Sequence, residues 1–81
     1  MDTKDAVKIA FDYFEELYKG QYSNLALEEV ELSDDEKVWF ITLGYNSSPI
    51  NPFAGLKQRE YKIFKIDSDS GKVKSMKIRK V

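Results

Sequence analysis

The feature that most constrains the fold is a change of hydrophobic period at Gly20. Before that glycine, apolar residues recur at helical spacing and fill one broad arc, which comprises Ala6, Val7, Ile9, Ala10, Phe11, Tyr13, Phe14, Leu17 and Tyr18. Asp2 or Thr3 can cap the start of this helix, and Gly20 can take the left-handed conformation that ends it. Phe14 and Leu17 lie well inside the arc, so we expect both to be buried between the helix and a sheet.

After Gly20, apolar residues alternate with polar ones, which is typical of β-strands. Strands are predicted at residues 26–33, 37–45, 59–67 and 72–80. They form two hairpins with turns at residues 33–36 and 67–71, joined by a long loop at residues 46–58 that contains prolines and a glycine. The predicted fold is therefore α+β, a single domain over residues 1–81 with one N-terminal amphipathic helix packed on a four-stranded antiparallel sheet.

The expected hairpin registers assign the side chains of the sheet to two faces. The predicted pairs are Leu32 with Val38, Leu27 with Leu43, Ile66 with Val73, Ile63 with Met76 and Tyr61 with Ile78. One face then holds Trp39, Ile41, Leu43, Tyr61, Ile63, Met76 and Ile78. The other face holds Val30, Leu32, Val38, Phe40, Phe64, Ile66 and Val73. We expect the helix to cover the face of Trp39, because that set is longer and more continuous.

The second face is too apolar to lie in water, because monomers rarely expose contiguous apolar patches beyond roughly a few hundred Å². Two coverings are open. One is the loop at residues 46–58, through Ile50, Phe53 and Leu56, and the other is a second protein, either another copy or a different chain. We predict a partner-binding surface that comprises Val38, Phe40, Phe53, Phe64 and Ile66.

The composition removes most catalytic chemistry. The chain has no cysteine and no histidine, so it lacks a thiolate nucleophile, the usual neutral-pH proton shuttle and the commonest metal ligand. A calcium loop is suggested by residues 67–71, DSDSG, but an EF-hand requires glycine at its sixth position and glutamate at its twelfth, where this run has Gly71 fifth and Ile78 twelfth. We predict a hairpin turn there, with no cofactor, no metal site and no enzymatic activity.

Charge is divided unevenly along the chain, although the net charge is only −1. Residues 1–45 carry eleven acidic and four basic side chains, and residues 46–81 carry three acidic and nine basic ones. Neighbouring elements that neutralise each other would explain this division. The alternative is a nucleic-acid-binding surface on the basic last strand, formed by Lys72, Lys74, Lys77, Arg79 and Lys80.

Residues 61–73, YKIFKIDSDSGKV, resemble the hairpin of PepSY-type domains, in which an alternating strand ends in an aspartate and is followed by a small polar turn with glycine and then a valine. The amphipathic helix before the strands agrees with that family. The resemblance implies a cystatin-like fold, in which an antiparallel sheet wraps around a helix. It also implies a non-catalytic role in binding or restraining another protein, often a peptidase. The long loop at residues 46–58 departs from the family pattern.

The first residues, MDTKD, carry mixed charge and lack the apolar stretch of a signal peptide, so we expect a cytoplasmic protein without a membrane span. The predicted function is that of a small non-enzymatic protein-interaction module. It would act through the apolar sheet face or the loop at residues 46–58, on a second copy or on a different protein. Nucleic-acid binding through the last strand is the alternative.

Overall fold

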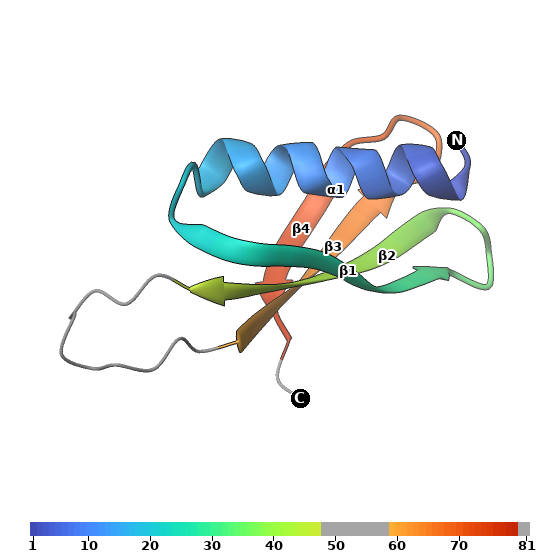
Figure 1. Ribbon diagram of the computed structural model, residues 1–81. Coiled ribbons are helices and arrows are strands. Elements are labelled where there is room, and N and C mark those ends of the chain that lie inside the picture. Colours follow the sequence, from blue (N-terminus) through green and yellow to red (C-terminus); the bar gives the residue numbers. More distant parts are fainter. Residues whose placement is uncertain (48–58, 80–81) are drawn as a thin grey trace, which may run out of the picture.

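The structure is a computed structural model that describes residues 1–47 and 59–79 (Figure 1). One helix precedes four strands, which are α1 (Thr3–Leu17), β1 (Tyr22–Leu32), β2 (Val38–Ser47), β3 (Arg59–Asp67) and β4 (Val73–Ile78). The strands are antiparallel, and each lies beside its neighbour in the chain, in the order β1-β2-β3-β4. The helix packs on one side of this sheet (Figure 1). The predicted α+β architecture is confirmed.

Local hydrogen bonds explain where α1 begins and ends. The Asp5 N–H donates to Asp2 Oδ1 at 2.9 Å, and the Asp2 N–H donates to Asp5 Oδ2 at 3.2 Å. This reciprocal capping box satisfies an N–H group that the first helical turn leaves without a partner. Beyond the last turn, the chain leaves the helix through Gly20, whose φ of +69° is a left-handed conformation that a side chain would oppose. Asp2 is therefore the N-cap, and Gly20 takes the predicted left-handed conformation in the turn that follows the C-cap, Tyr18.

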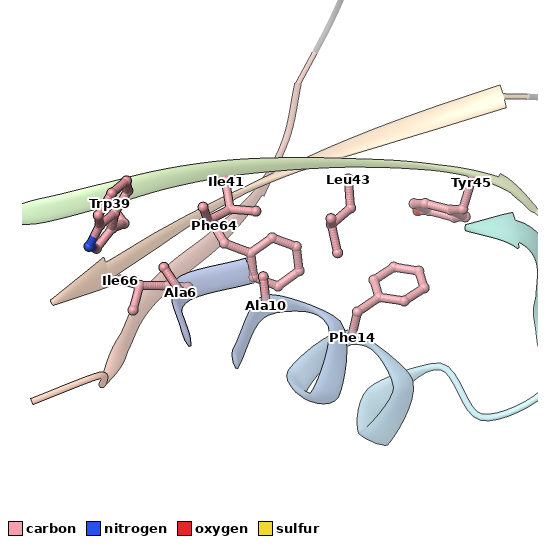
Figure 2. Packing of buried hydrophobic residues seen from close by; sticks show 9 residues of the cluster. All are labelled: Ala6, Ala10, Phe14, Trp39, Ile41, Leu43, Tyr45, Phe64 and Ile66. Atoms are coloured by element: carbon pink, nitrogen blue, oxygen red, sulfur yellow. The ribbon is translucent and has the colours of Figure 1, made fainter. Parts of the chain in front are cut away.

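The core lies between α1 and the middle of the sheet (Figure 2). Ala6, Ala10 and Phe14 form one line along the helix, and all three are fully buried. They pack against alternate residues of β2 and two residues of β3, namely Trp39, Ile41, Leu43, Tyr45, Phe64 and Ile66. The two alanines let the helix backbone approach the sheet closely, because they have no side chain beyond Cβ. The helix covers the face of Trp39 as predicted, and the expected burial of Phe14 is confirmed.

Leu17 departs from the arc that the sequence predicted. Its side chain is 53% exposed, although its spacing is that of a core residue. Leu17 lies one helical turn beyond Tyr13, whose ring meets the ring of Phe64 on β3 edge-on at 6.1 Å. Figure 1 shows that the first part of β3 lies well away from this end of the helix, because the sheet is twisted. The expectation that Leu17 is buried is therefore wrong.

The pairing of β2 with β3 corrects the faces that the sequence predicted. Ile41 lies opposite Phe64, and Trp39 lies opposite Ile66. Residues that pair directly across antiparallel strands point to the same face, so Phe64 and Ile66 lie beneath the helix, where both are fully buried. Their predicted place on the face away from the helix is wrong. Three other residues expected on that face also pack against the core, and these are Val30, Leu32 and Val73.

For Tyr61 and Ile63 the predicted face is also wrong, in the opposite direction. The sequence placed them beneath the helix, but they lie opposite Gly44 and Thr42, on the other face of the sheet. The physical reason is that turn residues set the register within a hairpin, whereas β2 and β3 belong to different hairpins. Their register depends on packing and cannot be counted from either turn.

A bulge in β1 shifts the register of the first hairpin. Leu27 lies opposite Leu43 as predicted, but Leu32 lies opposite Trp39. Glu28 is the extra residue of β1 that causes this slip of one position. The predicted register therefore holds on one side of Glu28 only.

The second hairpin contains a similar irregularity in β4. Ile66 lies opposite Val73 as predicted, but Met76 lies opposite Phe64, one position from the expected partner. Lys74 is the extra residue here. Both bulges coincide with a break in alternation, because two polar residues stand in a row at Glu28-Glu29 and at Lys74-Ser75.

Candidate functional site

The face of the sheet away from α1 is the surface from which the sequence predicted partner binding, and we call it the uncovered face. Strand pairing aligns its side chains in two central rows. The rows are Glu31, Phe40, Lys65 and Ser75, then Glu29, Thr42, Ile63 and Lys77. By the same alternation, the face continues at its ends through Val38, Gly44 and Tyr61. No helix or strand among residues 1–47 and 59–79 lies over it (Figure 1).

Two shallow hollows lie on the uncovered face. The larger is about 330 Å³ and is lined by Glu29, Glu31, Phe40, Thr42, Ile63 and Arg79. The smaller is about 180 Å³ and is lined by Glu28, Glu29, Thr42, Tyr61 and Arg79. Both include Thr42, whose short side chain lowers the surface at the centre of β2. The larger hollow is thus lined by one aromatic and one aliphatic side chain together with charged groups.

Arg79 crosses the uncovered face from the end of β4. Its backbone N–H donates to the carbonyl oxygen of Tyr61 at 2.9 Å, which continues the ladder beyond β4. Its guanidinium Nη1 lies 2.6 Å from Glu29 Oε2 on β1 and donates to Thr42 Oγ1 at 3.2 Å. The hydrogen bond and the charge of Glu29 raise the pKa of Arg79 above its usual value. One side chain therefore links both edges of the sheet.

A second ion pair lies next to the first on the same face. Glu28, the extra residue of β1, places its Oε1 at 2.8 Å from Arg59 Nη2, and Arg59 Nη1 donates to the carbonyl oxygen of Asn24 at 2.7 Å. The pair lies over Gly44, where an added Cβ would lie 2.7 Å from Glu28 Oε1. The guanidinium of Arg59 also lies 6.0 Å from the centre of the Tyr61 ring. Glycine at position 44 is what allows this pair to lie flat on the sheet.

The charges of the uncovered face are separated by strand. In the two central rows, the acidic residues lie on β1, and the lysines lie on β3 and β4. Within residues 1–47 and 59–79, Glu31, Lys65 and Lys77 form no ion pair. Phe40 and Ile63, both partly buried, lie between the two kinds of charge. Apart from the two arginines that reach across to β1, the surface therefore runs from acidic through apolar to basic across the sheet.

The predicted partner-binding residues do not form one surface. Val38 and Phe40 lie on the uncovered face and are partly buried. Phe64 and Ile66 are fully buried beneath α1, so they cannot contact a partner on that face. Phe53 lies outside the described residues. Ile63 and Tyr61 are the β3 residues that lie on the uncovered face instead of Phe64 and Ile66. Only the β2–β3 register could have identified them.

The predicted nucleic-acid residues are likewise divided among different surroundings. Lys72 follows the β3–β4 turn, Lys74 is the bulge residue and Lys77 lies on the uncovered face. Arg79 is paired with Glu29, and Lys80 lies outside the described residues. The structure does not bring the described four into one row of basic side chains.

The turn at residues 67–71 has the role of a hairpin turn, as predicted. Asp67 Oδ1 accepts the N–H groups of Asp69 and Ser70, each at 2.9 Å, and these bonds lower the pKa of Asp67. Gly71 has a φ of +74°, and its N–H donates to the carbonyl oxygen of Asp67 at 2.9 Å. In the part of the chain that the structure describes, no three acidic side chains gather closely enough to hold a metal ion.

Among the same residues, no helix has the length and apolar content that crossing a bilayer requires. Comparison of the chain with protein-family models, with curated proteins and with solved structures gave no match. The uncovered face itself is therefore the basis on which a function can be assigned.

Proposed function

We propose that this chain is a small non-enzymatic protein-interaction module that binds its partner through the uncovered face. The observation that carries the proposal is the hollow lined by charged groups and by Phe40 and Ile63, which are diagonal neighbours on β2 and β3, with no described helix or strand over it. Contiguous apolar side chains at the centre of an open sheet face are typical of binding surfaces. Protein interfaces commonly combine such a centre with a polar rim.

The ion pairs make this surface suitable for binding. Arg79 is held by Glu29, Thr42 and its own backbone bond, so little side-chain freedom remains to be lost when a partner binds. Arginine and aromatic residues also contribute most strongly to the energy of protein interfaces. Phe40 and Arg79 line the same hollow and are the expected centre of the contact.

The resemblance of residues 61–73 to PepSY-type hairpins favours the same kind of role, in which a domain binds or restrains another protein without catalysis. Nucleic-acid binding is less well supported, because Glu28, Glu29 and Glu31 lie on the same face as Lys77 and Arg79. A phosphate backbone would meet those carboxylates together with the basic groups, and the repulsion would reduce affinity.

The test compares Phe40→Glu with Leu17→Glu, which places the same charge at a 53% exposed apolar position on the helix. Each immobilised chain is mixed with nuclease-treated lysate and with the free chain, after circular dichroism has shown that it is folded. We expect the wild-type chain and Leu17→Glu to retain a protein that Phe40→Glu loses. Equal retention by all three chains, or no retention by any, would contradict the proposal. Retention from untreated lysate that is absent from nuclease-treated lysate would favour the nucleic-acid alternative.

A further inference from the structure

Building on the proposed function, we infer that the partner of the uncovered face is a second copy of this chain, packed face to face about a two-fold axis parallel to the strands. The starting observation is the order of residues within the two central rows. One row runs from Glu31 on β1 to Ser75 on β4, and the other runs from Glu29 to Lys77. Each row has a glutamate on β1, an apolar residue on β2 or β3, and a lysine on β3 or β4.

This order makes the face complementary to itself in one orientation. A two-fold axis that runs along the strands, between β2 and β3, places β1 of one copy over β4 of the other. The acidic edge then meets the basic edge twice, because a two-fold contact repeats every interaction. An axis perpendicular to the strands would place β1 over β1 and oppose like charges. Charge complementarity therefore selects the first orientation.

The same orientation brings the apolar centres together. Phe40 on β2 lies over Lys65 of the other copy, and Ile63 on β3 lies over Thr42 of the other copy, so the four apolar side chains meet diagonally around the axis. The strands of the two sheets would then lie roughly 30° apart, the angle that twisted sheets adopt when they pack in alignment.

Glu31 and Lys77 are the residues best placed to form new ion pairs. Neither forms an ion pair with a described residue of its own chain. In the proposed dimer, Glu31 of one copy lies over Ser75 on β4 of the other copy. Lys77 of that other copy is two residues further along β4, a distance of about 7 Å. Long side chains can span that diagonal. Glu29 is already held by Arg79, so it contributes less.

The size of the face indicates how strong the dimer is. Four strands about 5 Å apart and about 20–30 Å long present roughly 400–600 Å² on each copy. The total of about 1,000 Å² is at the low end for specific interfaces. We therefore expect a reversible dimer whose population depends on protein concentration and which salt weakens.

The experiment reverses the two charges separately. Glu31→Lys alone would place the introduced lysine opposite Lys77 in both halves of the dimer, and Lys77→Glu alone would oppose two glutamates. In an equimolar mixture of the variants, a mixed dimer restores opposite charges at both contacts. Sedimentation velocity over a concentration series should show each variant associating at least about tenfold more weakly than wild type, and the mixture recovering the wild-type value. Glu16→Lys, on the exposed surface of α1, is the control and should dimerise normally.

Three results would overturn the inference. They are a wild-type chain that stays monomeric at every concentration, a dimer that Phe40→Glu leaves intact, and charge variants whose mixture does not recover. The proposed function fails separately. If the wild-type chain is monomeric but Phe40→Glu still abolishes capture of another protein, only the inference is lost. If Phe40→Glu changes neither self-association nor capture, both are lost.

Discussion

Thr42 and Gly44 are the two small residues of β2 on the uncovered face, and each lies beneath an arginine–glutamate pair. Their small size lets Arg79 and Arg59 reach across β2 to the glutamates of β1. The pairs are partly exposed, so each contributes little to stability, typically about 0.2–1 kcal/mol. Their larger effect is geometric, because they define where charge lies around Phe40.

Tyr45 determines part of the pH dependence of stability. Its side chain is buried, and its hydroxyl donates to Glu60 Oε2 at 2.8 Å. Burial, and then Glu60, raise the pKa of Tyr45 well above the ordinary value of 10.0. A phenol whose pKa is raised by folding stabilises the fold fully below the unfolded pKa, and this contribution is lost as the pH rises above it.

We therefore expect Tyr45→Phe to lower the free energy of unfolding by about 1 kcal/mol at pH 7, through the lost hydrogen bond. The variant should also lose less stability than wild type between about pH 10 and pH 12, because it has no phenol at this site to ionise on unfolding. Urea unfolding at several pH values measures both effects. An equal alkaline loss in the two proteins would show that Tyr45 does not contribute in this way.

At the scale of elements, α1 is attached to the sheet through an aromatic cluster at its C-terminal end. The ring of Phe14 lies 4.6 Å from that of Tyr18, 4.9 Å from that of Tyr22 and 4.7 Å from that of Tyr45. These contacts join the helix to the start of β1 and the end of β2. Near the N-terminal end, two fully buried alanines take the place of rings.

This arrangement predicts very different effects for two apolar residues of α1. Phe14→Ala should lower the free energy of unfolding by about 3–5 kcal/mol, because it removes a fully buried ring and leaves a cavity. Leu17→Ala should change it by no more than about 0.5 kcal/mol, because that side chain is largely exposed. Chemical denaturation of the two variants measures the difference. Similar losses would mean that the helix packs through another face.

At the scale of the whole molecule, the uneven charge of the chain is partly neutralised within the sheet. Glu28 pairs with Arg59 and Glu29 pairs with Arg79, so the acidic first part of the chain is bound to the basic second part. This agrees with the expected neutralisation between neighbouring elements. Glu31, Lys65 and Lys77 form no ion pair with described residues, and they make the uncovered face electrically asymmetric.

If a second copy covers that face, stability should depend on protein concentration. Binding that requires the folded state raises the melting temperature as concentration increases. We expect the wild-type melting temperature to rise as the protein concentration is increased over a roughly hundredfold range. The melting temperature of Phe40→Glu should stay constant over the same range. Differential scanning calorimetry and fluorescence together cover this range. A melting temperature that is independent of concentration in both proteins would argue against a folded dimer.

What the sequence determined was local. The helical arc, the role of Gly20, the four strands and the two turns all follow from periodicity and turn chemistry within short segments. The pairs of Leu27 with Leu43 and of Ile66 with Val73 were also predicted correctly, within single hairpins. The α+β fold could be derived from these signals because one amphipathic helix has to bury its apolar arc against the sheet.

What only the tertiary structure decided was the relation between segments. The register of β2 with β3 places Phe64 beneath the helix and Ile63 on the uncovered face, and neither of the two predicted turns lies between those strands. The bulge at Glu28 and the exposure of Leu17 likewise depend on packing and on sheet twist. Because a strand alternates with a period of two, one residue of slip exchanges the two faces. The candidate site lies on one of those faces, so its composition depended on a register that local patterns do not contain.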